Sequence, residues 1–328
     1  TMESRSIRVE YKSVLHAWIL GMLASVRGYF PVIGGLGFLR FFLTPLTFEN
    51  VFCSQPDVVI SCGARNAAVN AWLAHNNKAK SIAILRPGTV PFRDLDLLIL
   101  PQHDVTEDKL PPHVLVTKAA LNLIDRFYIE ENVRRLLSRF SHLKLNLKPK
   151  IGVLIGGDTK SARMTEQQVR IIVHQLKEIA GKYNADFLIT TSRRTSPQIE
   201  QLLVKEFKDY ARTALFIIAN RDNEPAAVGG ILGLSDILVV SGESVSMVSE
   251  AASSGKKTVV FPIDGDGRKP LKDKYTRFVE NLGRQGHIIY AETTGMAYAV
   301  DSALRNKIST KPLNDCIVLS EALKRIIG

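Results

Sequence analysis

The chain has 328 residues, of which 45% are hydrophobic and 23% are charged, and its formal net charge is +11. This composition is that of a globular protein and excludes a disordered or low-complexity chain, while the length favours two domains. The positive charge is scattered, with no arginine-rich tract or zinc-finger pattern, so we expect no nucleic-acid partner, whereas an anionic lipid surface or a polyanionic substrate remains compatible with it.

The first segment with a regular pattern, residues 5–11, alternates polar and apolar side chains as a half-buried strand does. Residues 14–46 are apolar, with Arg27 and Arg40 as the only charged residues. The longest apolar run there is shorter than the roughly 20 residues that span a bilayer. Two interpretations stay open: a pair of core helices, or an apolar and basic surface that enters a membrane interface.

From residue 56 onward, short apolar runs alternate with helical patterns, which is typical of parallel β/α/β units. We expect strands at residues 56–63, 81–88 and 94–104 of the first half, and a basic helix over residues 121–140. Pro149 then indicates a linker. The predicted domains are therefore residues 1–148 and 149–328, with the last helix, residues 318–327, expected to pack back on the first domain.

The second half repeats the alternation, with strands expected at residues 150–158, 185–191, 214–219, 236–240 and 257–263. The predicted fold is α/β, with a doubly wound parallel sheet in each domain. Ligands of such proteins bind at the carboxyl ends of the strands, and we expect a cleft between the two domains there. The three cysteines (Cys53, Cys62 and Cys316) show no metal spacing and no disulfide framework, so buried thiols in a reducing compartment are expected.

Two loops that follow strands of the second half carry residues suited to a phosphate. The candidates in the first loop are Gly156, Gly157, Thr159 and Lys160, since glycines allow backbone N–H groups to approach an anion and lysine adds charge. The alternative is a plain tight turn. The candidates in the second loop are Ser192, Arg193, Arg194 and Thr195.

Adjacent arginines in that second loop suit bidentate contact with phosphate, and the sequence does not distinguish between them. The alternative is a solvated loop in which one arginine binds a carboxylate.

A third candidate site begins the helix over residues 244–255. The backbone and side chains of Ser244, Val245, Ser246 and Met247 lie at its amino end, where free N–H groups and the helix dipole attract an anion. Glu250, further along, has a carboxylate that could accept both hydroxyls of a ribose. Small residues around it permit close approach of a ligand or of a neighbouring element. The alternative is a helix packed on the sheet with Glu250 exposed.

Residues that follow strands of the first half form a separate candidate group. Those expected to line the cleft from this side are Gly63, Arg65, Asn66 and Arg86. His103 beside Asp104 is a weak candidate for a general acid–base pair, with packing or capping as the alternative.

The segments VLIGGDTKS, TTSRRT and SGESVSMVSEAASSGK together resemble three signature segments of the ELM family, named after a plant mitochondrial-fission protein. PDVVISCGARNAA and FRDLDLLILPQHD match the N-terminal half of the same family. These proteins are similar to glycosyltransferases of the GT-B architecture. The resemblance implies two Rossmann-like domains and a nucleotide-sugar donor, carrying UDP or another nucleoside diphosphate, with no metal and no other cofactor. It also implies that Glu250 binds the donor ribose, that Gly156 and Gly157 border the diphosphate, and that residues 217–219 meet the base.

The chain departs from the family pattern at its start. Family members usually begin with a strand and a loop of the type S-D-G-x-x-G-x-x-x-Q, whereas this sequence starts at what looks like the second strand, so the catalytic base is not assigned. The expected function is transfer of a sugar to a membrane lipid or lipid-linked glycan of a bacterial cell envelope, in the cytoplasm at the inner membrane. The alternatives are a non-catalytic membrane-surface scaffold of the same fold and a nucleotide-sugar epimerase.

Overall fold

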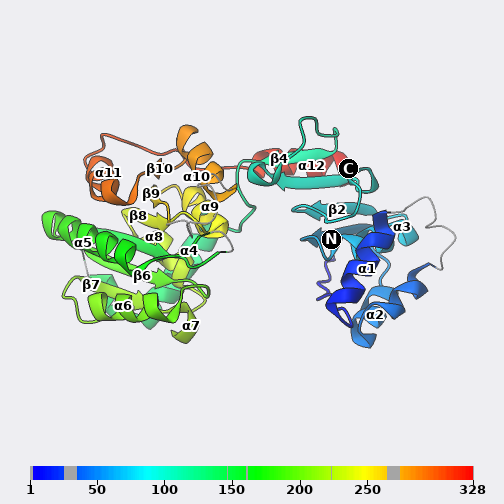
Figure 1. Ribbon diagram of the computed structural model, residues 1–328, viewed down its shortest axis with the longest axis horizontal. Helices are drawn as coiled ribbons and strands as arrows, with labels where there is room; N and C mark the ends of the chain where they lie inside the picture. Colours follow the sequence, from blue (N-terminus) through cyan, green and yellow to red (C-terminus); the bar gives the residue numbers. More distant parts are fainter. Residues whose placement is uncertain are drawn as a thin grey trace. The chain divides into compact units, whose positions relative to one another are not determined.

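The computed structural model of the protein describes residues 3–25, 35–145, 147–159, 162–222, 224–263 and 274–327 (Figure 1). Internal contacts divide the chain into two compact units. Unit 1 comprises Thr1–Thr117 and Asp315–Gly328, and unit 2 comprises Lys118–Asn314. The division thus falls at residue 117, whereas the sequence pattern placed it at residue 148.

Unit 1 contains a four-stranded parallel sheet in the order β1-β2-β3-β4. Its strands are β1 (Val58–Cys62), β2 (Lys80–Ile84), β3 (Leu97–Pro101) and β4 (Val114–Thr117). Its α-helices are α1 (Val14–Ser25), α2 (Pro45–Phe52), α3 (Ala67–Asn77) and α12 (Cys316–Ile327), and its 3-10 helices are η2 (Leu36–Phe41), η3 (Phe92–Asp94) and η4 (Gln102–Asp104). β3 is buried along its whole length, as its continuous apolar sequence requires.

The strand predicted over residues 5–11 is wrong. This segment joins neither sheet, and its one bridge in the described chain pairs Tyr11 with Leu43. Its alternating pattern has another cause, because Ile7, Val9 and Tyr11 pack against the apolar cluster of unit 1.

α1 is a core helix on one side, as the first interpretation of this apolar segment expects. Leu20 and Ala24 are buried in a cluster with Trp72 of α3, so one side of the helix belongs to the core. The opposite side carries the exposed residues Val14, Leu15, Trp18 and Met22. Across the described ranges, no helix combines the length and the apolar character that a bilayer crossing requires.

The expectation of buried thiols is also wrong, since all three cysteines are exposed. Cys53 and Cys62 lie at the ends of short elements of unit 1, and Cys316 begins α12, which buries none of its residues fully. The apolar flanks of these cysteines suggested burial, but the elements that carry them are covered on one side at most.

Unit 2 contains a six-stranded parallel sheet in the order β10-β9-β8-β5-β6-β7, which confirms a doubly wound α/β fold. Its strands are β5 (Lys150–Ile155), β6 (Asp186–Thr191), β7 (Thr213–Ile217), β8 (Ile237–Ser241), β9 (Lys257–Phe261) and β10 (Ile289–Tyr290). Its α-helices are α4 (Arg126–Arg139), α5 (Glu166–Tyr183), α6 (Pro197–Phe207), α7 (Ala219–Asp222), α8 (Ala227–Leu234), α9 (Val245–Ser253), α10 (Lys274–Arg284) and α11 (Met296–Leu304), and its 3-10 helices are η5 (Ser141–Leu145) and η6 (Thr293–Gly295).

Two apolar layers cover the two faces of this sheet. One layer joins α5, α6 and α11 to residues such as Val153 and Val239, and the other joins α4, α8, α9 and α10 to residues such as Leu154 and Val240 (Figure 1). Successive strand residues therefore face opposite layers, as the period of a strand dictates. The sheet is closed to solvent on both faces and leaves its strand ends available for function.

Close packing of α4 on α8 explains why residues 118–148 belong to unit 2. A Cβ atom at Gly229 would approach Tyr128 and Asn132 of α4 to 2.8 Å and 2.7 Å, and one at Gly230 would meet Leu136. The glycines of α8 thus allow the two helices to approach more closely than side chains would permit. The sequence pattern assigned α4 to the first domain because it read Pro149 as the linker and could not detect this packing.

Candidate functional site

The sheet of unit 2 has its topological switch point between β5 and β8. From β5 the chain adds β6 and β7 on one side of the sheet, and then β8, β9 and β10 on the other. Connections leave the adjacent ends of β5 and β8 in opposite directions, and ligands of doubly wound folds bind in the crevice that this creates. The turns after β5, β6 and β8, which are neighbours in the sheet, carry the three groups of candidates found in the sequence.

Two hydrogen bonds join the turns after β5 and β8, and a third stabilises the β8 turn itself. The Gly156 N–H donates to Ser241 Oγ at 2.7 Å, and the Gly157 N–H donates to Glu243 Oε1 at 2.8 Å. Ser241 Oγ in turn donates to Glu243 Oε1 at 3.2 Å. The two glycine N–H groups, expected to be free for a phosphate, are therefore occupied by side chains of the protein.

Both glycines are required by the closeness of neighbouring atoms. A Cβ atom at Gly156 would overlap Glu243 Oε1, and one at Gly157 would overlap the carbonyl of Arg194 and the backbone nitrogen of Thr195. The glycines thus bring three turns together, and their role in the described structure is packing of the loops. Of the other candidates in this loop, Thr159 hydrogen-bonds Ala162 through its backbone N–H at 2.9 Å, and Lys160 lies outside the described residues.

The turn after β6 is fixed by its hydroxyl groups. Thr195 Oγ1 donates to the Gly156 carbonyl at 2.5 Å and accepts from the Ser192 N–H at 3.0 Å, while Ser192 Oγ accepts from the Arg194 N–H at 3.1 Å. Arg193 and Arg194 are exposed, and neither guanidinium has an ion pair within the part of the chain that the structure describes. The alternative of an arginine bound to a carboxylate is not what the structure shows, so both cations are available to a ligand.

α9 begins directly after the β8 turn. Ser244 is its buried N-cap residue and Ser246, in the first turn, is exposed, whereas the Met247 side chain is part of the core beside Val245. Glu250 is half-buried, its carboxylate receives no hydrogen bond from the described residues, and burial raises its pKa to about 6. A carboxyl group that is partly desolvated and unpaired can accept hydrogen bonds from a ligand without first breaking others.

The small residues of α9 accommodate a neighbouring segment. Ser249 Oγ accepts from the Ala120 N–H at 3.2 Å, and Ser253 Oγ accepts from Asn122 Nδ2 at 3.2 Å. Residues 118–124 therefore lie against the same helix that carries Glu250. Of the two uses considered for the small residues, the structure shows the packing one.

The end of β7, expected to meet the nucleotide base, has its N–H groups engaged. The Ile218 N–H donates to Asp222 Oδ2 at 2.6 Å, and the Ala219 N–H donates to Thr191 Oγ1 at 3.0 Å. These contacts hold the loop in place, and the role expected for residues 217–219 stays a prediction.

In unit 1, the candidates after β1 shape a turn. Gly63 has a φ of +84°, which favours glycine, and its N–H donates to the Ile84 carbonyl at 2.9 Å. Asn66 Nδ2 donates to the Cys62 carbonyl at 3.0 Å, and Arg65 is exposed while its carbonyl accepts from the Tyr11 hydroxyl. The exposed Arg65 side chain is the candidate of this turn that is accessible to a ligand.

The other unit 1 candidates are engaged with their own loop. Arg86 forms two 2.9 Å bonds to the Glu107 carboxylate, which hold the pKa of Glu107 at about 2, and a 3.0 Å bond to the Asp104 carbonyl. His103 Nε2 and Asp104 Oδ1 are 3.9 Å apart, which allows electrostatic attraction but is too long for a hydrogen bond. Arg86 thus stabilises the segment after β3, and the His103–Asp104 pair is not arranged for proton transfer between the two residues.

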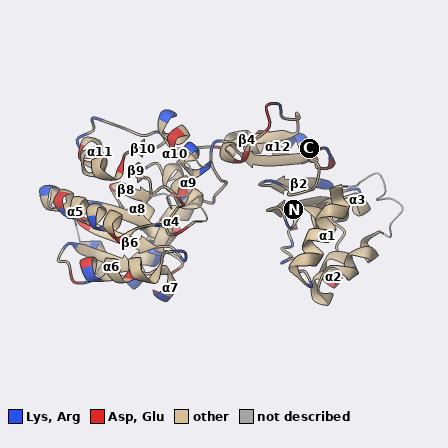
Figure 2. Cartoon of the chain, viewed as in Figure 1, with Lys and Arg blue, Asp and Glu red and all other residues tan. Residues whose placement is uncertain are grey.

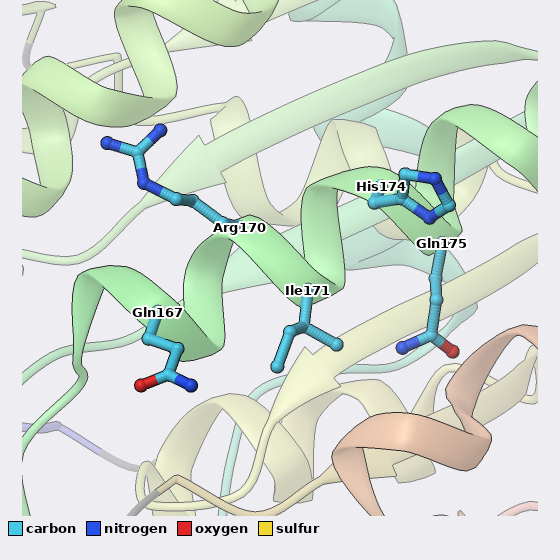
Figure 3. A pocket seen from close by; sticks show the side chains of 5 residues that line it. All are labelled: Gln167, Arg170, Ile171, His174 and Gln175. Atoms are coloured by element: carbon cyan, nitrogen blue, oxygen red, sulfur yellow. The ribbon is translucent and has the colours of Figure 1, made fainter.

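A separate hollow of about 520 Å³ lies along the outer side of α5 (Figure 3). Its lining residues all come from this one helix: Gln167, Arg170, Ile171, His174 and Gln175. Gln175 is already used in the fold, since its side chain binds the Thr293 carbonyl and the Ala297 N–H. The hollow involves none of the candidate loops, and the described residues hold no cluster of three or more potential metal ligands.

The chain has two α/β units with parallel sheets. One of them is doubly wound and has loops suited to a ligand at its switch point, as the domains of GT-B proteins do. Solved structures agree. The chain matches a proposed UDP-N-acetylglucosamine 2-epimerase of Listeria monocytogenes with a TM-score of 0.55 at 12% identity, over 98% of this chain and 80% of that one. For the UDP-GlcNAc 2-epimerase of Methanocaldococcus jannaschii the TM-score is 0.52 at 16% identity, over 81% and 76%. At these identities the likeness shows the fold.

The chain belongs to the family described as Mitochondrial fission ELM1, whose model matches residues 38–326. It is 27% identical over 297 residues to protein RP120 of Rickettsia prowazekii, covering 82% of this chain and 79% of that protein. It is 24% identical over 292 residues to the mitochondrial fission protein ELM1 of Arabidopsis thaliana, covering 82% of this chain and 64% of that protein. The resemblance found in the sequence motifs is thereby confirmed.

Proposed function

We propose that the protein is a glycosyltransferase that takes its sugar from a nucleotide-sugar bound to unit 2. The observation that carries this proposal is the set of groups left available at the switch point of the sheet. Two exposed arginines follow β6, and an exposed serine lies in the first turn of α9 after β8. The half-buried carboxyl group of Glu250 follows on the same helix, and none of these charged groups has an ion pair among the described residues. Cations and a helix amino end suit a diphosphate, and the carboxylate suits ribose hydroxyls.

Each group has a defined part in such a reaction. Arg193 or Arg194, with Ser244 and Ser246 at the start of α9, would hold the diphosphate and stabilise the negative charge that develops as the nucleoside diphosphate leaves. Glu250 would accept both ribose hydroxyls. The glycines of the β5 turn would act indirectly, because their N–H groups bind side chains of the β8 turn and hold that turn in position.

A membrane lipid or lipid-linked glycan is the acceptor that unit 1 supports best. Val14, Leu15, Trp18 and Met22 form a stripe on α1 in which each side chain is between 42% and 70% exposed. α1 contains no Lys, Arg, Asp or Glu (Figure 2). An exposed apolar stripe with a tryptophan suits a membrane interface, where the amphipathic indole ring is favoured.

Cations stand beside this stripe. Lys12, two residues before α1, donates from Nζ to the Arg40 carbonyl at 2.7 Å, and the Arg40 guanidinium lies over the ring of the exposed Phe41. An apolar stripe flanked by basic side chains fits the surface of an anionic bilayer. This supports a protein that works peripherally at a membrane, on the side where nucleotide-sugars are present.

Titration calorimetry with UDP and other nucleoside diphosphates tests the proposal. Saturable binding that weakens at least about tenfold in Arg193→Ala or Arg194→Ala is expected, since a charged hydrogen bond contributes about 1.5–3 kcal/mol. The matched control is Arg221→Ala, an exposed arginine of α7. Absence of binding by any nucleoside diphosphate to the wild-type chain would refute the proposal.

A non-catalytic membrane-surface scaffold is the second candidate, and two observations favour it. The N–H groups of Gly156 and Gly157 are satisfied within the protein, and the Arabidopsis relative is a mitochondrial fission protein. A scaffold would bind vesicles but neither bind nor consume a nucleotide-sugar. Conversion of a nucleotide-sugar in the absence of any acceptor would instead indicate an epimerase.

A further inference from the structure

The carboxyl group of Glu243 is buried at the switch point of the unit 2 sheet. The residue is 3% exposed and lies in the turn between β8 and α9. Its Oε1 accepts two hydrogen bonds, from the Gly157 N–H and from Ser241 Oγ. Its Oε2 is buried and has no hydrogen-bond partner among the described residues. Oε1 of the carboxyl group is therefore hydrogen-bonded, whereas Oε2 is buried without a partner among the described residues.

This carboxyl group is the first member of a chain of contacts through all three candidate loops. Glu243 holds Gly157 of the β5 turn, Ser241 holds Gly156 of the same turn, and the Gly156 carbonyl accepts from Thr195 of the β6 turn. Through Ser241 and Gly156, Glu243 thus helps to position the turn that carries Arg193 and Arg194. A change in the charge of Glu243 acts on every loop that the nucleotide would touch.

The charges around Glu243 favour a neutral acid once an anion is present. Burial raises the pKa of Glu243, while hydrogen bonds from its own backbone, Ser241 and Gly157 and the positive charge of Arg194 lower it. Among the described residues, the other charged groups on these three turns and on α9 are Arg193, which is exposed, Asp158 of the β5 turn, whose Oδ1 accepts from the Met164 N–H, and Glu250. Asp158 and Glu250 are carboxyl groups, so neither favours a negative charge on Glu243.

A bound diphosphate alters this balance in two ways. Its negative charges disfavour the ionised form of Glu243. It also engages Arg194, whose positive charge lowers the pKa of Glu243. Both effects favour addition of a proton to the bare Oε2, where the new O–H becomes a hydrogen-bond donor while Oε1 continues to accept from Gly157.

We propose that Glu243 is a positioning residue that takes up one proton from solvent when a nucleoside diphosphate binds to these loops, an inference that rests on the proposed nucleotide-sugar function. The proton forms an O–H bond at Oε2, and no bond of the ligand is broken. Binding of the donor is thereby coupled to pH through a residue that does not need to touch the sugar.

Calorimetric titration of UDP into the full chain, in two buffers of different ionisation enthalpy, tests this proposal. At about pH 8 the second phosphate ionisation of UDP and that of Glu250 are both complete, so neither contributes protons. The wild-type chain should take up protons from the buffer as UDP binds. The UDP affinity of the wild-type chain should also fall as the pH is raised, because binding needs the protonated acid.

Glu243→Gln is the informative variant, since its amide oxygen can still accept from Gly157 and its NH₂ group replaces the O–H. It should bind UDP with no proton uptake and with an affinity that does not change between about pH 7 and 9. The matched control, Glu178→Gln on the exposed side of α5, should retain the wild-type uptake.

The outcomes separate the two proposals. UDP binding to the wild-type chain without proton uptake overturns the role of Glu243 and leaves the nucleotide function standing, and this measurement needs no variant to fold. Unchanged uptake in Glu243→Gln also overturns it. Absence of UDP binding to the wild-type chain refutes the nucleotide function, and the inference falls with it.

Discussion

Substitution of Gly157 by alanine tests the reasoning about the three turns most directly. The added Cβ would overlap backbone atoms of Arg194 and Thr195, which cannot move aside as the end of a side chain could. Overpacking of a tight interior typically costs about 1–3 kcal/mol, and a backbone clash lies at the upper end of that range. Separation of the turns would also strain the bond from the Gly157 N–H to Glu243. We therefore expect a loss of about 3 kcal/mol in the stability of unit 2.

The matched control is Gly181→Ala in α5. A Cβ atom at Gly181 would meet nothing within 4 Å, and an alanine within a helix is favoured over glycine. This variant should gain about 0.5–1 kcal/mol. Thermal and urea unfolding, followed by circular dichroism, measure both changes. Equal stability of Gly157→Ala and the wild-type chain would show that the contact between the β5 and β6 turns is not as close as described.

The remaining predictions concern the ribose site, the apolar stripe and the thiols. UDP binding should weaken as the pH falls through about 6, because protonated Glu250 no longer accepts two hydroxyl groups and because the terminal phosphate of UDP takes up a proton in the same range. Glu250→Gln should bind about tenfold more weakly at neutral pH and should keep only the part of this acid dependence that comes from UDP, as calorimetry would show. Trp18→Glu should reduce sedimentation with anionic vesicles at least about tenfold, whereas Tyr298→Glu, at an exposed position of α11, should not; equal binding of both would contradict a membrane role for α1. A thiol reagent should titrate all three cysteines of the native chain, and a thiol that reacts only after denaturation would contradict their exposure.

The strands β5 to β9 of unit 2 could be predicted from the sequence because each is a short apolar run, and β5, β6 and β8 end at or before a glycine, serine or threonine. β5 and β8 are buried along almost their whole length, so their sequences carry little other information. The strand prediction over residues 5–11 failed because alternation of polar and apolar side chains shows that one side of a segment is buried. It does not show that the backbone hydrogen-bonds to a sheet. α4 was assigned to the wrong unit because the glycines that receive it, in α8, come about a hundred residues later.

The candidate site could be located but not resolved from the sequence. Strand ends with glycine, arginine or serine indicated one edge of the sheet, and the structure brings these turns together there, since parallel strands place their carboxyl ends at the same edge. Glu243 was missed as a functional group, although it directly follows Ser241-Gly242 after a buried strand. Its importance depends on the meeting of the β5 and β8 turns, which are some 85 residues apart in the chain. The one signal available was an acidic residue in a turn otherwise built of small residues.

The packing of α4 against the glycines of α8 also determines how the protein can be dissected. A fragment cut at the proline before β5 would begin after α4 and leave the glycine surface of α8, with the adjoining apolar side chains, uncovered in water. Such a fragment would be expected to aggregate. A recombinant piece with the limits Lys118–Asn314 retains both helices, and it is the natural starting point for solution NMR of unit 2.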